Sequence, residues 1–373
     1  MKAVTTTSRK VYDARWAAFR SWCKQQKPKV KHPTRANQVV VTRFLNEKAK
    51  TVSFNTIKGY ITALSRQHRG IDYGGQCHPL SSVYSIKTWL KGLQNSTTTT
   101  RSRTPKWCLE LVLKTLTKPP YYPLDKNKTG WRKFLTRRTV FLTAVTSARR
   151  TSELHAIDYD VDFTGVDVRL WPDTDFKPKV NTAWHRNRPI IVPAMFENVD
   201  PYLQKLCVHR ALNDYLNETL TFRAGNGTSQ LFLCYGGKCL GEPASKKTIS
   251  RWLVDTINDA YVRHKLEKPL KVTGHQVRGQ AASWGVQAGL DPQTICEAAT
   301  WSSKSTFVKA YSLKVAYKNR SIFGRRVLSA PVAKARDAAA ERRQPTVHRD
   351  QRAASRRAAG ITPGYVIPRV SRR

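Results

Sequence analysis

The chain has 373 residues, of which 40% are hydrophobic, and a formal net charge of +41. This length is sufficient for two domains with cores of their own, without disulfide staples. The sequence contains no secretory apolar region and no window near the roughly 18 apolar residues of a membrane span. We therefore expect an intracellular protein with no membrane partner. The charge points to a polyanionic partner, with nucleic acid as the first candidate.

The positive charge is not confined to the C-terminal tail. Residues 331–373 carry eleven Lys and Arg against three Asp and Glu, a balance of +8, so +33 of the +41 lies in the rest of the chain. A charge spread over the body of the protein favours a fold that contacts nucleic acid over a neutral enzyme with a basic tail.

Four runs of apolar residues at helical spacing occupy residues 7–93. They are Val11, Trp16, Phe19 and Trp22; Val41, Phe44 and Leu45; Ile57, Tyr60, Ile61 and Leu64; and Val83, Ile86, Trp89 and Leu90. This pattern predicts four short amphipathic helices whose aromatic side chains form a core. The basic residues between them, Lys58 and Arg66 among others, are the expected phosphate contacts.

A polar stretch without periodicity, NSTTTTRSRTP at 95–105, predicts a linker between domains 1–94 and 106–328. Beyond it, the pattern predicts an apolar helix that runs into SARRTSELHAI, strands at 166–171, 188–194 and 230–235, and a helix at 245–261 opened by serine. Residues 329–373 form a basic tail that we expect to be disordered without a partner.

The segment TGHQVRG places His275 and Arg278 three residues apart before an apolar run. At a helix start this spacing brings both side chains onto neighbouring positions, where they can converge on one small anion. Further residues of phosphate chemistry occur elsewhere in the second domain. In chain order the set is Arg150, Lys177 or Lys179, His275, Arg278, Trp301 and Tyr311.

This order and these local patterns resemble the tyrosine recombinases of the phage-integrase group, over nearly all of residues 7–320. RTSEL resembles the family's Arg-x-x-Glu-Leu box, TGHQVRG its His-x-x-Arg box, and WSSKSTFVKAY the segment that leads to the nucleophile. LHAI, FKPK and SKKTISRW look most like recombinases of eukaryotic DIRS-type mobile elements. The resemblance implies a mainly α fold with a small β-sheet: a helical, SAM-like core-binding domain followed by an α+β catalytic domain.

The resemblance also implies a catalytic role for each residue. Tyr311 would attack the phosphorus and form a 3′-phosphotyrosine. Arg150 and Arg278 would clamp the non-bridging oxygens with their guanidinium forks. His275 would bind the phosphate and assist proton transfer, whereas Trp301, at a position where many members have histidine, can donate only its indole N–H.

Two assignments depend on the choice between neighbours. The hairpin lysine that protonates the leaving 5′ oxygen is Lys177 or Lys179, and FKPK favours Lys179, which leaves Lys177 as a DNA contact. Arg150 has the Thr-Ser-Glu-Leu continuation, so we interpret Arg149 as a surface or DNA-backbone contact. Glu153 is expected to be a structural partner of a basic neighbour.

The resulting hypothesis is cleavage and rejoining of duplex DNA for a mobile or viral element, in the nucleus, by copies of the chain assembled on DNA as dimers or tetramers. The alternatives are a catalytically silent DNA-binding protein derived from such an enzyme and a type IB topoisomerase-like activity. No cofactor or metal is implied, because the sequence has neither a P-loop pattern nor a carboxylate cluster suited to two-metal chemistry.

Overall fold

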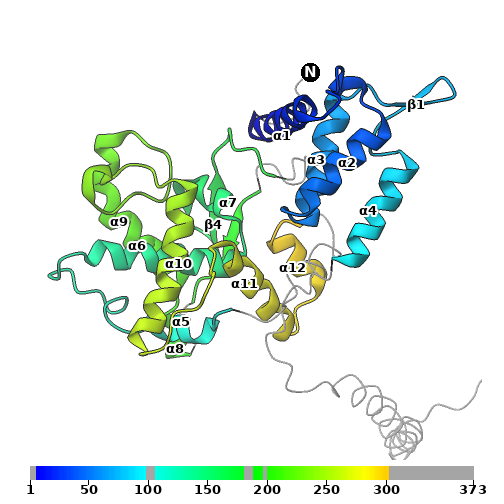
Figure 1. Ribbon diagram of the computed structural model, residues 1–373. Helices are drawn as coiled ribbons and strands as arrows, with labels where there is room; N and C mark the ends of the chain where they lie inside the picture. The colour runs from blue at the N-terminus through cyan, green and yellow to red at the C-terminus, as the bar shows by residue number, and fades with distance from the viewer. Residues whose placement is uncertain (1–5, 98–105, 180–187, 196–199, 302–373) are drawn as a thin grey trace, which may run out of the picture. The chain divides into compact units, whose positions relative to one another are not determined.

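The computed structural model describes residues 6–97, 106–179, 188–195 and 200–301 (Figure 1). The chain divides into two compact units, Met1–Ser102 (unit 1) and Arg103–Arg373 (unit 2), and each contains its own hydrophobic core. Among the described residues, no helix has the length and apolar character that a membrane crossing requires.

Unit 1 is built from four helices and a small hairpin. Its elements are α1 (Thr6–Gln25), the 3-10 helix η1 (Pro33–Arg35), α2 (Gln38–Ala49), α3 (Phe54–Gln67), β1 (Ile71–Tyr73), β2 (Gln76–His78) and α4 (Tyr84–Ser96). The four predicted helices are therefore confirmed. Side-chain caps fix two helix starts, since Asn37 accepts the backbone N–H of Val40 and Ser53 accepts that of Thr56.

The core of unit 1 is aromatic, as the helical spacing predicts. Phe19 and Phe44 are fully buried and pack edge to face, with ring centroids 5.0 Å apart. Val11 was expected on the same apolar face, but it is 43% exposed. The hairpin was not predicted: its turn uses Gly74 and Gly75 at φ 61° and 84°, which glycine adopts without strain.

Unit 2 is mainly helical. Its helices are α5 (Leu109–Leu116), α6 (Trp131–Ser147), α7 (Thr151–His155), α8 (Pro201–Gln204), α9 (Val208–Asn226), the 3-10 helix η3 (Gly237–Cys239), α10 (Lys246–Arg263), α11 (His275–Gln287) and α12 (Pro292–Ala298). Helix α6 contacts α9, α10 and α11, and its residues are buried on nearly every side. Ser245 caps α10 by accepting the backbone N–H of Thr248, as expected of a helix opened by serine.

A three-stranded antiparallel sheet completes unit 2. Strands β3 (Ile157–Asp162), β4 (Val168–Pro172) and β5 (Ile190–Val192) pair in that order, and β4 and β5 match two of the predicted strands. Helix α7 leads directly into β3, so the RTSEL segment lies at the start of the sheet. The mainly α architecture with a small sheet is thus confirmed.

The third predicted strand, at 230–235, is wrong. This segment forms only isolated bridges, Asp158 with Gln230 and Leu233 with Pro243. Its backbone groups bond to several partners: the N–H of Leu231 donates to the carbonyl of Ile157, and the carbonyl of Phe232 accepts the N–H of Ala244. Side chains of α9 take further groups, since Arg223 donates to the carbonyls of Gln230 and Leu231, and the N–H of Leu233 donates to the Tyr215 hydroxyl at 2.8 Å. Because these bonds are divided among different partners, the apolar run does not form a continuous ladder.

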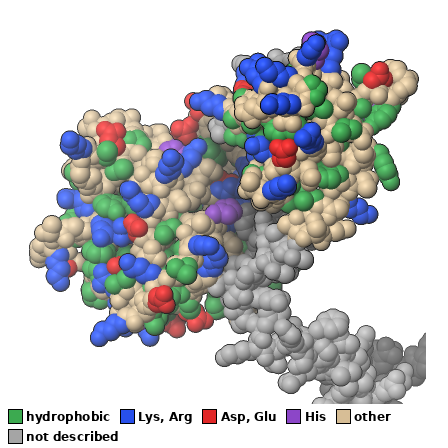
Figure 2. Space-filling model, in the orientation of Figure 1, with side chains coloured by type: hydrophobic (Ala, Val, Ile, Leu, Met, Phe, Trp, Pro, Cys, Tyr) green, Lys and Arg blue, Asp and Glu red, His purple; other side chains and the backbone are tan. Residues whose placement is uncertain are grey.

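Lys and Arg side chains are distributed over the visible surface of both units (Figure 2). This distribution agrees with the excess positive charge outside the C-terminal tail.

Candidate active site

Arg150 and Glu153 are held together at the start of α7. Arg150 is the N-cap residue, in extended conformation, and Glu153 occupies the third helical position. One carboxylate oxygen of Glu153 accepts the Arg150 backbone N–H at 3.1 Å, and the other accepts Nη1 of the same arginine at 2.6 Å. The carboxylate also sits favourably in the first turn of the helix. The predicted structural role of Glu153 beside a basic residue is confirmed.

Arg278 approaches the same carboxylate from α11. Its Nη1 lies 3.8 Å from Oε2 of Glu153, and its Nη2 donates to the carbonyl of Ala299. The arginine is 1% exposed and Glu153 5% exposed, so this is a buried arrangement of charges. The Thr300 hydroxyl lies 3.4 Å from the other carboxylate oxygen. Glu153 thereby joins two arginines that are far apart in the sequence.

Gly274, the first glycine of TGHQVRG, allows α11 to begin close to α10. A Cβ on Gly274 would lie 2.8 Å from Oγ and 3.0 Å from the backbone of Ser250 on α10. A side chain here would push the two helices apart, because backbone atoms cannot move aside cheaply. Gly274 precedes His275, the first residue of α11, and Arg278 follows three residues later. The predicted helix start is confirmed.

Trp301 forms the apolar side of this cluster. The guanidinium carbon of Arg278 lies 4.6 Å from the centroid of the Trp301 ring, a cation–π distance. The tryptophan is 5% exposed and packs with a small group of buried residues: Ala148, Ala282, Ile295, Cys296 and Ala299. Its packing role is therefore visible, whereas the indole hydrogen bond to a phosphate stays a prediction.

His275 shares the electrostatic environment of both arginines. Its pKa is lowered, first because part of the residue is desolvated and then because Arg278, Arg150 and Lys179 are positively charged neighbours. Another part of the residue stays exposed to solvent. The carboxylate of Glu153 acts in the opposite direction. The arrangement favours the neutral imidazole, which can accept a proton.

The two hairpin lysines lie after β4 and are both exposed. The charge of Lys179 acts on His275, which places this lysine near the cluster. Its role as general acid, and that of Lys177 as a DNA contact, stay predictions. Tyr311 lies outside the described residues. The structure thus brings together Arg150, Lys179, His275, Arg278 and Trp301.

The predicted DNA contacts of unit 1 are exposed on α3. Lys58 and Arg66 lie over aromatic rings of their own unit, with the charged atom 5.7 Å from the Phe54 centroid and 5.6 Å from the Tyr12 centroid respectively. These positions suit phosphate contacts, but DNA binding by either residue stays a prediction.

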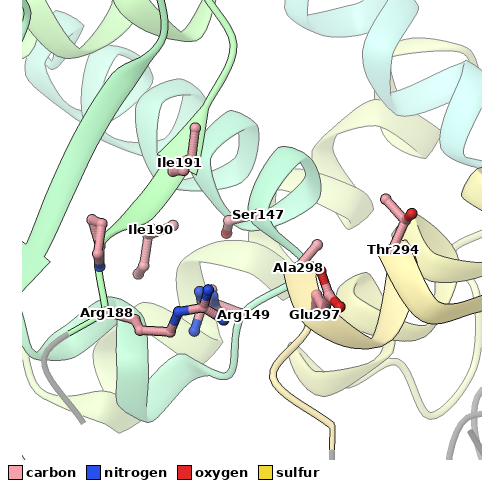
Figure 3. Close-up of a pocket in the computed structure, with 9 residues that line it drawn as sticks. Ser147, Arg149, Arg188, Ile190, Ile191, Thr294, Glu297 and Ala298 are labelled. Carbon is pink, nitrogen blue, oxygen red and sulfur yellow. The ribbon is translucent and has the colours of Figure 1, made fainter. Parts of the chain in front are cut away.

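Arg149 differs from the expected surface position. It is half-buried and lines a pocket of about 360 Å³ together with Arg188, which sequence reasoning missed (Figure 3). Burial lowers the pKa of Arg149, and the charges of Arg188 and Arg150 lower it further, against the influence of Glu153. No sequence signal marks Arg188, because it lies apart from every motif and meets Arg149 only in the folded unit.

No group of three or more His, Cys, Asp and Glu in the described part of the chain could hold a metal ion. The cations, the imidazole and the buried carboxylate of the cluster around Glu153 can bind a negatively charged group and move a proton beside it.

Comparison with solved structures shows which known proteins share this fold. No protein-family model and no curated protein sequence matches the chain. Three of the solved structures that match are the Tn1549 transposon integrase with transposon right end DNA, a lambda integrase dimer bound to a COC′ core site, and the XerH site-specific recombinase bound to difH substrate.

These three structures align over most of the chain. For the Tn1549 integrase the TM-score is 0.56 at 14% identity, over 89% of this chain and 95% of that one. For lambda integrase the TM-score is 0.53 at 12% identity, over 86% of this chain and 75% of that one. For XerH the TM-score is 0.51 at 14% identity, over 87% of this chain and 78% of that one. At these identities the likeness concerns the fold, and the chain has the fold of tyrosine recombinases.

Proposed function

We propose that this protein cleaves and rejoins duplex DNA through a covalent 3′-phosphotyrosine formed by Tyr311. The observation that carries the proposal is the convergence of Arg150, Arg278 and His275 around one buried carboxylate, with Lys179 nearby. Phosphodiester cleavage without a metal requires cations on the non-bridging oxygens and a group that moves a proton, and this cluster contains both.

Each residue of the cluster has a defined part in the proposed step. The Tyr311 oxygen forms a bond to phosphorus while the bond from phosphorus to the 5′ oxygen breaks. His275, whose lowered pKa favours the neutral imidazole, accepts the proton of the Tyr311 hydroxyl, and Lys179 supplies a proton to the leaving 5′ oxygen. Arg150 and Arg278 stabilise the charge that accumulates on the phosphoryl oxygens. Since Arg278 is 1% exposed, a phosphate reaches it only after the groups that cover it move.

Glu153 fixes the direction of the two guanidinium groups in this proposal. It accepts one hydrogen bond from the Arg150 guanidinium and one from the Arg150 backbone N–H, and it lies within ion-pair distance of Arg278. A planar guanidinium held at one edge presents its other N–H groups in a fixed orientation, which suits bidentate contact with a phosphate. The carboxylate therefore acts as a positioning residue and not as a base.

The proposed substrate is the end of a mobile or viral element, and the proposed assembly is a dimer or tetramer of the chain on DNA. The positive charge of the body and the DNA complexes among the structural neighbours, one of them a lambda integrase dimer bound to a COC′ core site, support this part. The DIRS-type character and the nuclear location rest on the sequence motifs and the basic composition alone. The silent DNA-binding protein and the topoisomerase-like enzyme are the alternatives.

Replacement of Arg278 by lysine tests the proposal. Arg278→Lys keeps one charge but lacks the fork, so we expect cleavage to slow by about 10²–10³, the usual effect of losing one oxyanion donor. Affinity for duplex DNA should change by no more than a few fold. The measurements are single-turnover cleavage and electrophoretic mobility shift on the same duplex.

A second variant is needed because Arg278 is buried, so that its replacement could reduce cleavage by disturbing the fold. In Arg150→Lys the altered side chain is 15% exposed, and the same loss of cleavage is expected with an unchanged unfolding midpoint. A parallel fall of cleavage and DNA affinity in both folded variants would contradict the proposal and favour a purely DNA-binding role.

A further inference from the structure

Three consecutive residues after α12 contact the cluster around Glu153. The carbonyl of Ala299 accepts an N–H from Nη2 of Arg278, and the centroid of the Trp301 ring lies 4.6 Å from the guanidinium carbon of that arginine. Between them, the hydroxyl of Thr300 lies 3.4 Å from Oε1 of Glu153. All three residues are buried. The backbone at the end of α12 therefore decides where these three groups lie.

A tight turn ends α12 and brings these residues into place. The N–H of Thr300 donates to the carbonyl of Glu297 at 3.1 Å, and the N–H of Trp301 donates to the carbonyl of Cys296 at 2.8 Å. This pair of hydrogen bonds defines a Schellman motif, and the packing of Cys296 and Trp301 in one apolar group is the hydrophobic contact that accompanies it. The motif needs a left-handed residue at its turn, and that residue is Thr300, at φ 50°.

Threonine is an unfavourable residue at this position. Its branched Cβ is strained at positive φ, where glycine is the usual residue. Helix α11 ends with the same pair of hydrogen bonds and has Gly289 at the turn, at φ 88°. Helix α10 ends in the same way with Lys265 at φ 56°, and its side chain is exposed. Of these three helix ends, that of α12 alone places a buried, β-branched side chain in the strained conformation.

The contact with Glu153 accounts for the hydroxyl at this position. Oε2 of Glu153 accepts the Arg150 backbone N–H and lies 3.8 Å from Arg278, while Oε1 accepts Nη1 of Arg150. Thr300 adds a neutral donor on Oε1. A buried carboxylate loses its hydration, so each donor around it lowers that cost and restricts its orientation. Glycine at the turn would relieve the backbone strain but would supply no donor.

We propose that Thr300 is a positioning residue for DNA cleavage, whose hydroxyl holds Glu153 in the orientation in which this carboxylate directs Arg150 and Arg278. The inference rests on the proposed function and adds one residue to it. Thr300 acts through Glu153 and takes no part in proton transfer. The strained backbone persists because the surrounding contacts fix it, as is common beside active sites.

Three substitutions separate the hydroxyl from the backbone strain. Thr300→Ser keeps the hydroxyl, Thr300→Ala removes it but keeps a Cβ at positive φ, and Thr300→Gly removes both. We expect single-turnover cleavage at saturating protein to stay near the wild-type rate in Thr300→Ser and to slow about tenfold in the other two, the effect of one hydrogen bond. Affinity for the same duplex should be unchanged in all three variants.

Stability should follow a different order from cleavage. Urea unfolding should give a higher midpoint for Thr300→Gly than for Thr300→Ala, because only alanine keeps the strained Cβ. Thr300→Ser should also exceed Thr300→Ala, because its hydroxyl still compensates Glu153. If Thr300 were merely structural, cleavage would follow the midpoint. We expect instead that the more stable Thr300→Gly cleaves as slowly as Thr300→Ala.

Lys265→Gly is the matched control. It removes the same backbone strain from the end of α10, where the side chain is exposed. The unfolding midpoint should rise and the cleavage rate should not change. A fall in cleavage as large as that of Thr300→Gly would mean that any change at a helix end of this unit slows the reaction, which would overturn the inference.

Two further results would overturn it. One is equal cleavage by Thr300→Ser and Thr300→Ala, and the other is a set of cleavage rates that ranks as the midpoints do. A wild-type protein that does not cleave DNA would contradict the proposed function instead. The midpoints would then decide the contact by themselves, because equal values for Thr300→Ser and Thr300→Ala would show that the hydroxyl does not hold Glu153.

Discussion

The predicted DNA contacts of unit 1 and the two clustered arginines of unit 2 are held in contrasting ways. In unit 1, Lys58 and Arg66 are exposed on α3 and rest over aromatic rings. In unit 2, Arg278 and Arg150 are enclosed, and a buried carboxylate fixes their direction. Exposed cations can adjust to a phosphate wherever it lies, whereas enclosed cations define one position for it.

This contrast suggests that one strongly basic chain can use different residues for DNA affinity and for catalysis. Exposed lysines and arginines contribute mainly through counterion release, which depends on their number and on salt. Enclosed arginines cost desolvation energy and are tolerated because Glu153 compensates them. We therefore expect substitutions in unit 1 to change DNA affinity and substitutions around Glu153 to change cleavage.

Of the two hairpin lysines, Lys179 is expected to have the larger effect on the cleavage rate. Loss of a general acid costs about 10²–10⁴ in rate, so Lys179→Ala should slow cleavage of ordinary DNA to this extent. A substrate with sulfur in place of the 5′ oxygen needs no acid and should restore the rate. Lys177→Ala is the matched control, and rescue in that variant instead would transfer the role to Lys177.

A smaller effect on affinity is expected from unit 1. Lys58→Gln and Arg66→Gln should each lower the slope of log affinity against log salt by about one, without changing the cleavage rate at saturating protein. Fluorescence anisotropy at several salt concentrations measures the slope. An unchanged slope in both variants would remove α3 from the DNA-binding surface and weaken the contrast between the units.

The smallest effect concerns the pH dependence of stability. His275 has a lowered pKa in the folded protein, so the unfolded chain, with an ordinary value of about 6.5, binds the proton more readily. The free energy of unfolding that His275 contributes is fully present at high pH. It decreases as the pH falls through the pKa of the unfolded state and becomes constant below the pKa of the folded state.

The variant His275→Gln should therefore lose less stability than the wild type between pH 7 and pH 5. Urea unfolding followed by circular dichroism measures the difference. His68 in unit 1, whose pKa burial also lowers, is present in both proteins and does not contribute to it. Identical pH profiles would mean that the surroundings of His275 do not disfavour its charge.

Local patterns were sufficient for much of the fold. The helical spacing of Phe19, Phe44 and Ile57 identified buried faces correctly, because an amphipathic helix encodes its buried side within a few turns. The exposed Val11 shows the limit of this reasoning, since periodicity does not say how far the core extends along a helix. The segment 230–235 was misjudged because its backbone bonds are divided among Ile157, Ala244 and side chains of α9, which no local pattern shows.

The candidate site could be predicted residue by residue but not as an arrangement. The motifs singled out Arg150, His275 and Arg278, and Glu153 was expected to pair with a basic neighbour, because a free carboxylate beside the phosphate would oppose the arginines. The packing of α7, α11 and β5 decides two further contacts: the same carboxylate lies near Arg278, and Arg149 lies near Arg188. Such contacts join residues far apart in the sequence, and no local pattern encodes them.

The covalent step at Tyr311 is the central claim, and trapping it is the most direct test. A nicked duplex that carries the element's ends loses its 5′ fragment after cleavage, so rejoining is blocked and a protein–DNA adduct should accumulate. We predict an adduct that resists denaturant, forms without magnesium and is absent in Tyr311→Phe, which removes only one oxygen and should still bind the duplex. An adduct that persists in the phenylalanine variant would place the nucleophile elsewhere, and its absence with the intact protein would contradict the proposed cleavage and favour a silent DNA-binding protein.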